Sequence, residues 1–334
     1  MKRFCLLVTL ALLTLLATQG GTQGRFFCPI SHLKWDKRTV PVSQVSTSAQ
    51  LLVGTYNIRY SNSGDSIKGN VWHKRCQVIC DQVNFMSPDI LGTQEVLHGQ
   101  LLDLLAGLDG YDYIGVGRDD GKTAGEYAAI FYRTDRVRLL DQGNFWLSDT
   151  PDQPGLGWDA ACVRVCSWGR FAPMTGSDQE SFYFFNLHMD HVGVTARREG
   201  ARLIVRKISE IAHGAPVIVT GDFNVDQNDE IYAILTQSGL LQDAYHAARL
   251  RFAENGTFNS FDPDLYTTSR IDHVFVSPAS RVDAYGVLTS GYWLPDKDSS
   301  TAIKGHDAPQ EINLGRYMRR LASDHYPVFV RLSL

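Results

Sequence analysis

Two polar residues follow a short apolar run in the segment 216–224, Pro-Val-Ile-Val-Thr-Gly-Asp-Phe-Asn. A run of β-branched residues opened by a proline is typical of a buried strand, and the glycine at its end is typical of a sharp turn. Such a strand end presents Asp222 and Asn224 on one side of the emerging chain. A carboxylate is a hard oxygen ligand for Mg²⁺, and an amide donates and accepts hydrogen bonds without adding charge. The pair can therefore bind a metal or a phosphate, although an ordinary turn has the same composition.

Five further segments deliver polar residues in the same way, at the end of an apolar run or inside one. They span residues 51–59, 89–95, 182–188, 270–276 and 323–328, and they supply Asn57, Arg59, Glu95, His188, Asp272, Asp324 and His325. Cleavage of a phosphate ester needs charge to offset the phosphate, an activated water, and a proton or cation for the leaving oxygen. Carboxylates, amides, histidines and an arginine can together meet these needs.

Taken in order, the six segments resemble the motifs of the endonuclease/exonuclease/phosphatase superfamily, from about Leu51 to the C-terminus. The superfamily includes pancreatic deoxyribonuclease, abasic-site endonucleases, neutral sphingomyelinases and inositol polyphosphate 5-phosphatases. The resemblance implies an α/β fold, a four-layer sandwich in which two packed mixed β-sheets are flanked by helices. Segments 145–151 and 157–159 are similar to exported or deadenylase-like bacterial members.

The resemblance also implies a metal centre. Glu95 is the best single metal ligand by this resemblance. The residues that complete a Mg²⁺ site, directly or through water, are Asn57, Asp222, Asn224 and Asp324. Mn²⁺ is the alternative ion, and Asp222 and Asn224 count among the catalytic residues as well.

Two pairs of a histidine and a carboxylate complete the implied site. Asp272 holds His325 in one tautomer and favours its protonated form. Glu126, in the segment 125–128, orients His188 as in the pancreatic deoxyribonuclease-like members. The pairs allow a general base and a general acid, or a base and a stabiliser of the transition state. We expect His325 at the attacking side and His188 at the phosphate or leaving group, with the direction left open.

Two arginines are predicted to contact the phosphate, since a guanidinium fork matches phosphate oxygens. Arg59 follows Asn57 by two residues and so shares its face, and Arg170 ends the strand predicted over 161–171. For each arginine, a solvated surface position is the alternative. Asp272 and the next residue, His273, alternate in direction, so His273 is expected to point away from the site.

The elements that must position these residues alternate along the chain. Apolar spacing predicts helices over 72–86, 98–108, 195–213 and 229–237, and apolar runs predict strands over 127–133, 137–146 and 161–171. Further strands are expected near Ile271, Val282 and Val328. Mixed helices and strands favour an α/β domain with helices outside the sheets. The polar segment 295–320 is predicted to be a surface loop beside the site.

The amino-terminal region predicts export. Lys2 and Arg3 precede an apolar run over 4–17 and a small, polar stretch over 18–24, which is the layout of a secretory signal peptide. The run is shorter than the roughly 20 apolar residues of a membrane span, so we expect no stable span. We divide the chain into a signal peptide (1–24), an arm or linker (25–50) and one catalytic domain (51–334), exported to the periplasm or the extracellular space.

Composition limits the function without fixing it. The chain has 334 residues, 44% of them hydrophobic, so it can bury a large core. Its formal net charge of -4 provides no global basic field of the kind that drives indiscriminate duplex binding, although a local arginine groove could still engage phosphates. The cysteines beyond the signal segment indicate buried free thiols rather than a dense disulfide framework.

The expected function is Mg²⁺-dependent hydrolysis of a phosphodiester by a nuclease-like monomer, with nucleic acid as one substrate class. The first alternative is a phospholipid or inositol-phosphate hydrolase. The second is a catalytically inactive protein that binds phosphorylated ligands, against which the two intact histidine pairs argue. Substrate identity depends on loops such as 296–314, which one sequence does not interpret.

Overall fold

The computed structural model describes residues 50–296, 309, 311–312 and 314–334. These residues belong to one compact unit that spans 48–334. The predicted signal peptide (1–24) and the predicted arm, apart from its last residue, lie outside the described residues, so both stay predictions. Within the described ranges, no helix combines the length and the apolarity that crossing a membrane requires.

The first of two large sheets contains the first and the last described strands, β1 and β15. In the described part of the chain it has seven strands, in the order β10-β12-β15-β1-β2-β4-β3. Their bounds are β1 Gln50–Asn57, β2 Ile90–Gln94, β3 Tyr111–Ile114, β4 Ile130–Arg133, β10 Leu250–Phe252, β12 Arg281–Val287 and β15 Val328–Ser333. β1 is parallel to β2 and antiparallel to β15. The end of β1 at Asn57 therefore lies beside Gln94 and close to the segment that leads into β15.

The second sheet has six described strands, in the order β5-β6-β7-β8-β11-β9. Their bounds are β5 Val137–Trp146, β6 Val165–Pro173, β7 Phe182–His188, β8 Val217–Asp222, β9 Gln242–Asp243 and β11 Asp272–Val276. β7 and β8 are parallel, which sets His188 opposite Asp222. β11 is antiparallel to β8, which sets Asp272 opposite the same residue. The strand pairing of this sheet alone therefore brings three predicted site residues, His188, Asp222 and Asp272, together at the ends of their strands.

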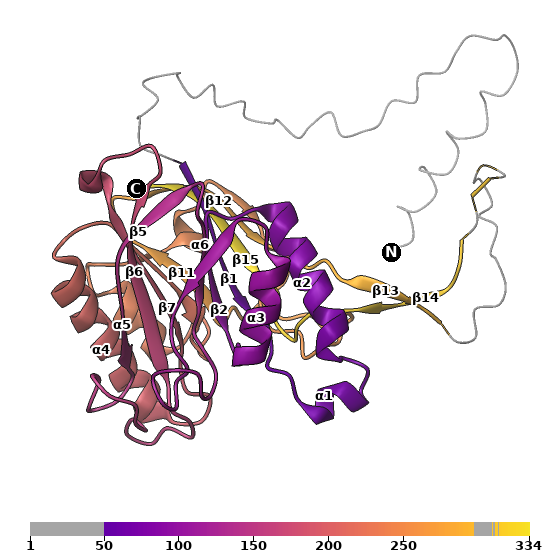
Figure 1. The fold of residues 1–334 in the computed structure, drawn as a ribbon, viewed down its shortest axis with the longest axis horizontal. Helices are drawn as coiled ribbons and strands as arrows, with labels where there is room; N and C mark the ends of the chain where they lie inside the picture. Colours follow the sequence, from indigo (N-terminus) through magenta and orange to yellow (C-terminus); the bar gives the residue numbers. More distant parts are fainter. Residues whose placement is uncertain (1–49, 297–308, 310, 313) are drawn as a thin grey trace, which may run out of the picture. The chain divides into compact units, whose positions relative to one another are not determined.

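Helices cover the outer face of each sheet (Figure 1). Their bounds are α1 Ser63–Ile67, α2 Trp72–Met86, α3 His98–Gly107, α4 Val194–Ala212, α5 Glu230–Thr236 and α6 Ala244–Ala247, with a short 3-10 turn over Asp178–Glu180. In α4, Leu203, Ile204 and Ile208 are buried at the spacing of one helix face and pack with the second sheet. Ile79 of α2 and Leu101 of α3 belong to another cluster, which packs against the first sheet.

The central core lies between the two sheets. Val53 and Ile90 of the first sheet pack there with Phe184 and Val274 of the second, and all four are fully buried. Figure 1 shows α2 and α3 on one side of the sheets and α4 and α5 on the other. The predicted four-layer α/β sandwich is confirmed.

The segment 295–320 differs from its prediction as a loop. Two strands, β13 (Tyr292–Pro295) and β14 (Tyr317–Arg320), pair as an antiparallel ribbon. Arg320 Nη1 donates to the carbonyl oxygen of Lys68 at 3.2 Å, which fastens the ribbon to the loop between α1 and α2. The loop prediction is therefore wrong at both ends of the segment, while residues 297–308 lie outside the described residues.

Strand β6 begins later than predicted. The backbone amides of Ala161 and Cys162 donate to the Asp190 carboxylate, each at 3.1 Å, so the chain is held out of the sheet until Val165. The free thiols predicted from the sequence are confirmed for the described cysteines, Cys76, Cys80, Cys162 and Cys166.

A buried ion pair stabilises the edge of the second sheet. Arg270 Nη1 lies 2.9 Å from Asp243 Oδ2, and the Tyr232 hydroxyl donates to the same oxygen at 2.7 Å. Arg270→Met leaves a buried carboxylate without its cation, so the free energy of unfolding in urea should fall by about 3–5 kcal/mol. Arg281→Met, which removes an exposed pair with Asp283, should cost less than about 1 kcal/mol. Equal losses in the two variants would contradict this account.

Candidate active site

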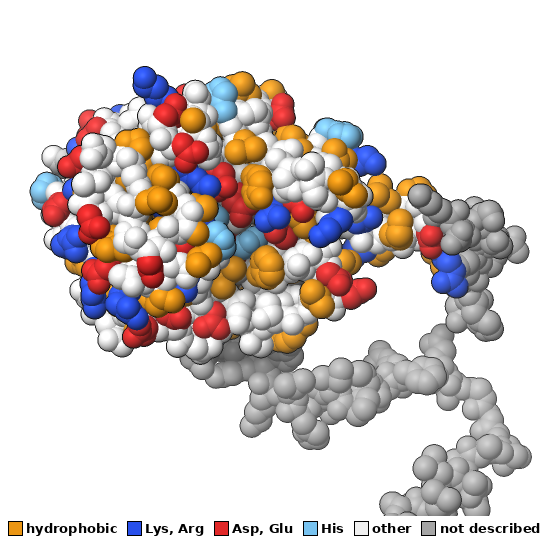
Figure 2. Space-filling view, turned by 90° about the horizontal axis from the view of Figure 1, so that it is seen from below, with side chains coloured by type: hydrophobic (Ala, Val, Ile, Leu, Met, Phe, Trp, Pro, Cys, Tyr) orange, Lys and Arg blue, Asp and Glu red, His pale blue; other side chains and the backbone are white. Residues whose placement is uncertain are grey.

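The strand ends of both sheets meet at one pocket of ≈ 630 Å³. Figure 2 shows acidic, basic and histidine side chains gathered near the centre of one face of the molecule. The pocket is lined by Arg59, Tyr60, Glu95, Arg118, Glu126, Cys162, Arg164, His188, His191, Asp222, Asn224, Phe258, Ile271, Asp324 and His325. Most of the residues predicted from the sequence are therefore brought together.

Asp222 is the centre of the site. Its Oδ2 accepts a hydrogen bond from Asn57 Nδ2 at 2.9 Å and lies 3.5 Å from His188 Nε2 and 3.6 Å from His325 Nε2. Burial raises the pKa of Asp222 to about 7, against the attraction of His325 and with a further contribution from the Asp272 charge. One oxygen of the buried Asp222 carboxylate therefore lies close to both His188 and His325.

His325 and Asp272 form the predicted pair. His325 Nδ1 lies 2.9 Å from Asp272 Oδ2, which directs Nε2 toward Asp222. Burial alone would lower the pKa of His325, but the charges of Asp272 and Asp222 hold it well above its usual range. These two carboxylates therefore favour the protonated form of His325. His273 points away, as predicted, and its Nε2 contacts the backbone oxygen of Val225 at 2.9 Å.

His188 has a different partner from the one predicted. The Asn224 amide lies 3.1 Å from His188 Nε2, and burial together with the charge of Arg164 holds the pKa of this histidine well below its usual range. Glu126 instead accepts a hydrogen bond from Arg118 Nη1 at 2.6 Å, because the two residues face each other across a tight loop. The predicted pairing of Glu126 with His188 is therefore wrong, although both residues line the pocket.

The acidic residues of the pocket fit a divalent cation. Glu95 Oε2 and Asp324 Oδ2 both lie near Arg59 Nη1, at 3.9 and 3.4 Å, and ligand atoms of Glu95, Asp222 and His325 lie within 4.8 Å of one another. Burial and the nearby Glu95 charge raise the pKa of Asp324, despite the opposing charge of His325. Carboxylates buried this closely repel one another until a cation lies between them. Oxygen-rich donors of this kind suit Mg²⁺ or Mn²⁺.

A second group of possible ligands, Cys162, Asp190 and His191, lies in the same part of the structure. The two oxygens of Asp190 already accept hydrogen bonds from four backbone amides, those of Ala161, Cys162, Val192 and Gly193. Asp190 therefore holds two turns together, and the oxygen-rich group around Asp222 is the better metal site.

Three site residues have left-handed backbone conformations, which L-residues adopt at a cost of about 1–3 kcal/mol. Their φ angles are 59° at Arg59, 61° at Glu95 and 51° at Asn224. Neighbouring site residues hold the backbone there: Asn57 Oδ1 accepts from the Arg59 amide, and Asp222 Oδ1 accepts from the Asn224 amide. Each kink turns the chain sharply after a strand. The side chains of Glu95 and Asn224 consequently enter the pocket.

Asn57, predicted as a metal ligand, lies between two carboxylates. Its Nδ2 donates to Glu95 Oε1 at 3.0 Å and to Asp222 Oδ2 at 2.9 Å. Arg59 lies on the same side, where its Nη1 is 3.4 Å from Asp324 Oδ2 and its Nε is 2.8 Å from Asp65. Asn57 therefore orients the acidic group, and Arg59 offsets part of its charge.

Arg170 lies outside the site, contrary to its prediction as a phosphate contact. Its Nε donates to the Ser181 hydroxyl at 3.0 Å, and its Nη2 lies near the backbone of Asp178. β6 runs antiparallel to β7, so the end of β7 at His188 adjoins the beginning of β6. The arginine just before this beginning, Arg164, lines the pocket instead.

Arg75 of α2 positions two segments of the site and was not predicted from the sequence, although it shares the buried helix face with Trp72 and Ile79. It is fully buried, and its guanidinium donates only to backbone oxygens among the contacts described. Nη1 donates to Ile58 at 2.7 Å and to Ala322 at 2.9 Å, Nη2 to Arg59 at 3.0 Å, and Nε to Asn70 at 2.9 Å. One side chain thus fixes the segment after β1 and the segment before β15, the two that carry Arg59 and Asp324.

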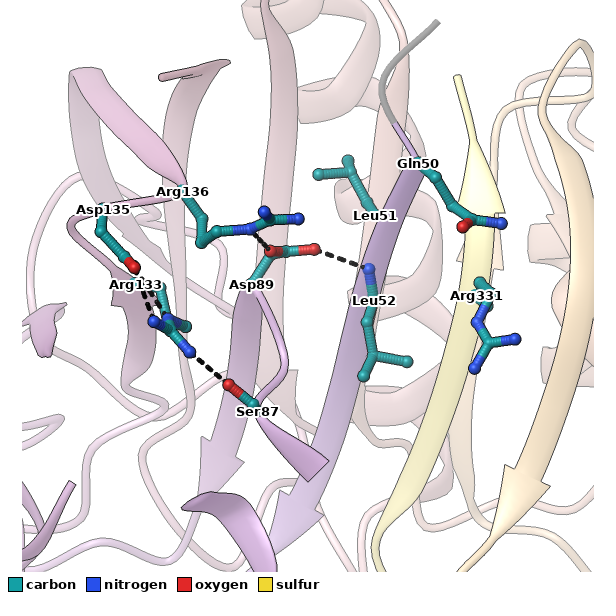
Figure 3. Close-up of a pocket in the computed structure, with 9 residues that line it drawn as sticks. All are labelled: Gln50, Leu51, Leu52, Ser87, Asp89, Arg133, Asp135, Arg136 and Arg331. Carbon is teal, nitrogen blue, oxygen red and sulfur yellow. Dashed lines mark hydrogen bonds and ion pairs between the residues drawn. The ribbon is translucent and has the colours of Figure 1, made fainter. Parts of the chain in front are cut away.

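A second hollow, of ≈ 400 Å³, lies at the beginning of β1 (Figure 3). Arg136 Nε is 2.8 Å from Asp89 Oδ1, and the Leu52 amide donates to Asp89 Oδ2 at 2.8 Å. Arg133 forms an ion pair with Asp135 on the same wall. These charged side chains pair with one another, and the hydrogen bond from Leu52 joins β1 to Asp89. We therefore assign this hollow a structural role.

Comparison with known proteins identifies the family. A model of the endonuclease/exonuclease/phosphatase family matches residues 54–325. The chain belongs to this family. Its members are hydrolytic, metal-dependent phosphoesterases. The superfamily predicted from the six segments is confirmed.

Among solved structures and curated proteins, the chain is similar to family members of several kinds. A mannosyl-6-phosphatase from Bacteroides thetaiotaomicron VPI-5482 is 47% identical, covers 85% of this chain and 100% of its own, and has a TM-score of 0.77. A family protein from Bacteroides vulgatus is 39% identical over 86% of this chain and 100% of its own, with a TM-score of 0.72. A probable RNA exonuclease of Saccharomyces cerevisiae is 26% identical over 239 residues, 65% of this chain and 46% of that protein.

The role of Arg75 can be tested by measuring metal affinity. Arg75→Met leaves four backbone oxygens without their donor, so Asp324 and Arg59 lose their fixed positions. Mg²⁺ affinity and kcat should each fall about 10- to 100-fold in the folded variant, as measured by calorimetry and turnover below its melting temperature. Lys74→Met, on the exposed face of the same helix turn, is the control. Unchanged Mg²⁺ affinity in folded Arg75→Met would refute this role.

Proposed function

We propose that the chain hydrolyses a phosphate monoester on a sugar or a similarly small polyol, with Mg²⁺ or Mn²⁺ held by Glu95 and Asp324. The observation that carries this proposal is the placement of one Asp222 oxygen 3.5 Å from His188 Nε2 and 3.6 Å from His325 Nε2. Similarity to a mannosyl-6-phosphatase over the whole of that protein supports a sugar phosphate as the substrate class. The pocket, ≈ 630 Å³, lies in the size range of small-molecule sites.

Each catalytic group has a distinct task in this proposal. A bound divalent cation would supply positive charge for the phosphate oxygens and the leaving group. Asp222, whose pKa is raised to about 7, accepts the proton of the attacking water as that water bonds to phosphorus and the bond from phosphorus to the sugar oxygen breaks. The leaving sugar oxygen takes its proton from solvent water. His325 Nε2, 3.6 Å from Asp222 Oδ2, orients this base and balances its charge. Asn224 and the neutral His188 bind the phosphate near the leaving group.

Hydrolysis of a phosphodiester, the expectation from the sequence, is the second candidate. The similarity to a probable RNA exonuclease favours it, although that alignment covers only 46% of the exonuclease. The net charge of -4 gives no general attraction for a polyanion. The monoester ranks first because the similarity to the sugar phosphatase is higher and extends over both proteins.

We further propose that the chain is exported and acts as a monomer. The basic pair Lys2 and Arg3 and the apolar run 4–17 support export to the periplasm or the extracellular space. All the site residues described above come from one compact unit of one chain, which supports a monomer.

A matched panel tests the substrate class. With Mg²⁺, a hexose 6-phosphate should be hydrolysed with kcat/KM at least about 100-fold above that of bis(p-nitrophenyl) phosphate or single-stranded RNA, a difference of about 2.7 kcal/mol. EDTA should abolish the activity, and Mg²⁺ or Mn²⁺ should restore it. Faster cleavage of RNA than of any monoester would reverse the ranking of the two candidates.

The catalytic histidine can be tested separately. His325→Gln removes the charged donor that Asp272 holds, so kcat on the best substrate should fall about 10²- to 10⁴-fold. Circular dichroism should remain that of the wild type. His73→Gln, at an exposed position of α2, should keep wild-type turnover. Turnover by His325→Gln close to that of the wild type would exclude this mechanism.

A further inference from the structure

An arginine with unused hydrogen-bond donors lines the wall of the active-site pocket. Arg164 is 5% exposed, yet its Nε and Nη1 have no hydrogen-bond partner among the described residues. Its Nη2 lies 3.2 Å from His191 Nδ1. A buried guanidinium has five N–H donors, and leaving several of them unused is costly unless a ligand accepts them.

The two carboxylates nearest Arg164 are already engaged elsewhere. Asp190 Oδ2 is 3.7 Å from Arg164 Nε, but its oxygens accept hydrogen bonds from four backbone amides. Glu126 Oε2 is 4.0 Å from Arg164 Nη1 and accepts from Arg118 Nη1 at 2.6 Å. Arg118 Nε is also buried without a hydrogen-bond partner in the described chain. Two guanidiniums with unused donors therefore lie at the wall that contains His188.

We propose that Arg164, assisted by Arg118, binds the non-bridging oxygens of a terminal phosphate and thereby selects monoesters over diesters. The inference rests on the proposed function and adds a specificity-determining pair to it. Glu95 follows a strand of the first sheet and Arg164 precedes a strand of the second, so a phosphate between them contacts both walls.

The chemistry of the two ester classes explains the selection. A phosphate monoester carries three non-bridging oxygens and about 1.5 to 2 negative charges at pH 7, whereas a diester carries two such oxygens and a single charge. The fork of a guanidinium binds two oxygens at once, which suits a terminal phosphate. A diester places a second alcohol group where the third oxygen of a monoester meets Arg164.

Binding of inorganic phosphate is the direct test, because it requires no turnover. Calorimetry with the full chain and Mg²⁺ compares the wild type, Arg164→Met, Arg164→Lys and Arg170→Met. The dissociation constant should rise at least about tenfold in Arg164→Met and less in Arg164→Lys, which keeps the charge but loses the fork. Arg170→Met lies in β6, the strand that Arg164 precedes, but outside the pocket, so its dissociation constant should stay within about twofold of the wild type.

If Arg164→Met does not fold, Arg164→Lys and Arg118→Met replace it in the test. Each of these two variants should weaken phosphate binding by at least about threefold, about 0.65 kcal/mol. Phosphate binding within about twofold of the wild type in every folded Arg164 and Arg118 variant would overturn the proposal.

Selectivity is measured as the ratio of kcat/KM for p-nitrophenyl phosphate to that for bis(p-nitrophenyl) phosphate. The ratio should fall at least about tenfold in Arg164→Met and stay constant in Arg170→Met. Equal losses of kcat/KM on the monoester and the diester would overturn the proposed selectivity for monoesters.

The two experiments separate this inference from the function on which it rests. Arg164-dependent phosphate binding in a wild-type protein that hydrolyses no ester would reject the proposed hydrolysis and keep the subsite. Hydrolysis of monoesters with phosphate binding independent of Arg164 would reject the subsite and keep the hydrolysis.

Discussion

Repulsion between buried carboxylates is the constraint on which the active site depends. Glu95 and Asp324 from the first sheet meet Asp222 and Asp272 from the second at one edge of the sandwich, and all four are buried. The protein offsets part of this charge with a protonated His325. In our proposal a divalent cation would offset the rest, so the crowding that destabilises this group of carboxylates would also give it affinity for metal. The raised pKa of Asp222, about 7, suits this residue to the role of the proposed base.

Hydrogen bonds to the backbone hold this group of buried carboxylates in place. The left-handed conformations at Glu95 and Asn224 place their side chains in the pocket. Arg75 fixes the two segments that lead to Arg59 and Asp324, and the Ser323 hydroxyl donates to the Asn57 backbone oxygen at 2.6 Å. The layers of sheet and helix outside them supply the burial that makes these contacts strong. Stability of the fold and reactivity of the site therefore depend on the same segments.

The features that could be predicted from the sequence are those that depend on residues close together in the chain. A polar residue that follows an apolar run is a local feature, so the amino-acid order marks Asp222 and Asn224 as candidates, and the resemblance of six such segments to one superfamily distinguishes them from an ordinary turn. The end of β6 that faces the site depends on its antiparallel pairing with β7, a contact between distant segments, and Arg170 was therefore predicted in place of Arg164. The partner of Glu126 likewise depends on a loop that brings Arg118 opposite it. Arg75 lies three residues after Trp72 and four before Ile79, which is the spacing of the buried face of α2, but only tertiary packing shows which backbone oxygens its guanidinium contacts.

Anomalous diffraction from crystals equilibrated with Mn²⁺ would locate the proposed metal site. We expect a peak within metal-ligand distance, about 2.0–2.6 Å, of oxygens of Glu95 and Asp324. The peak should disappear in Glu95→Gln, which removes one ligand charge while the fold is kept. Absence of a peak at saturating Mn²⁺, or a peak only between Cys162, Asp190 and His191, would contradict the account.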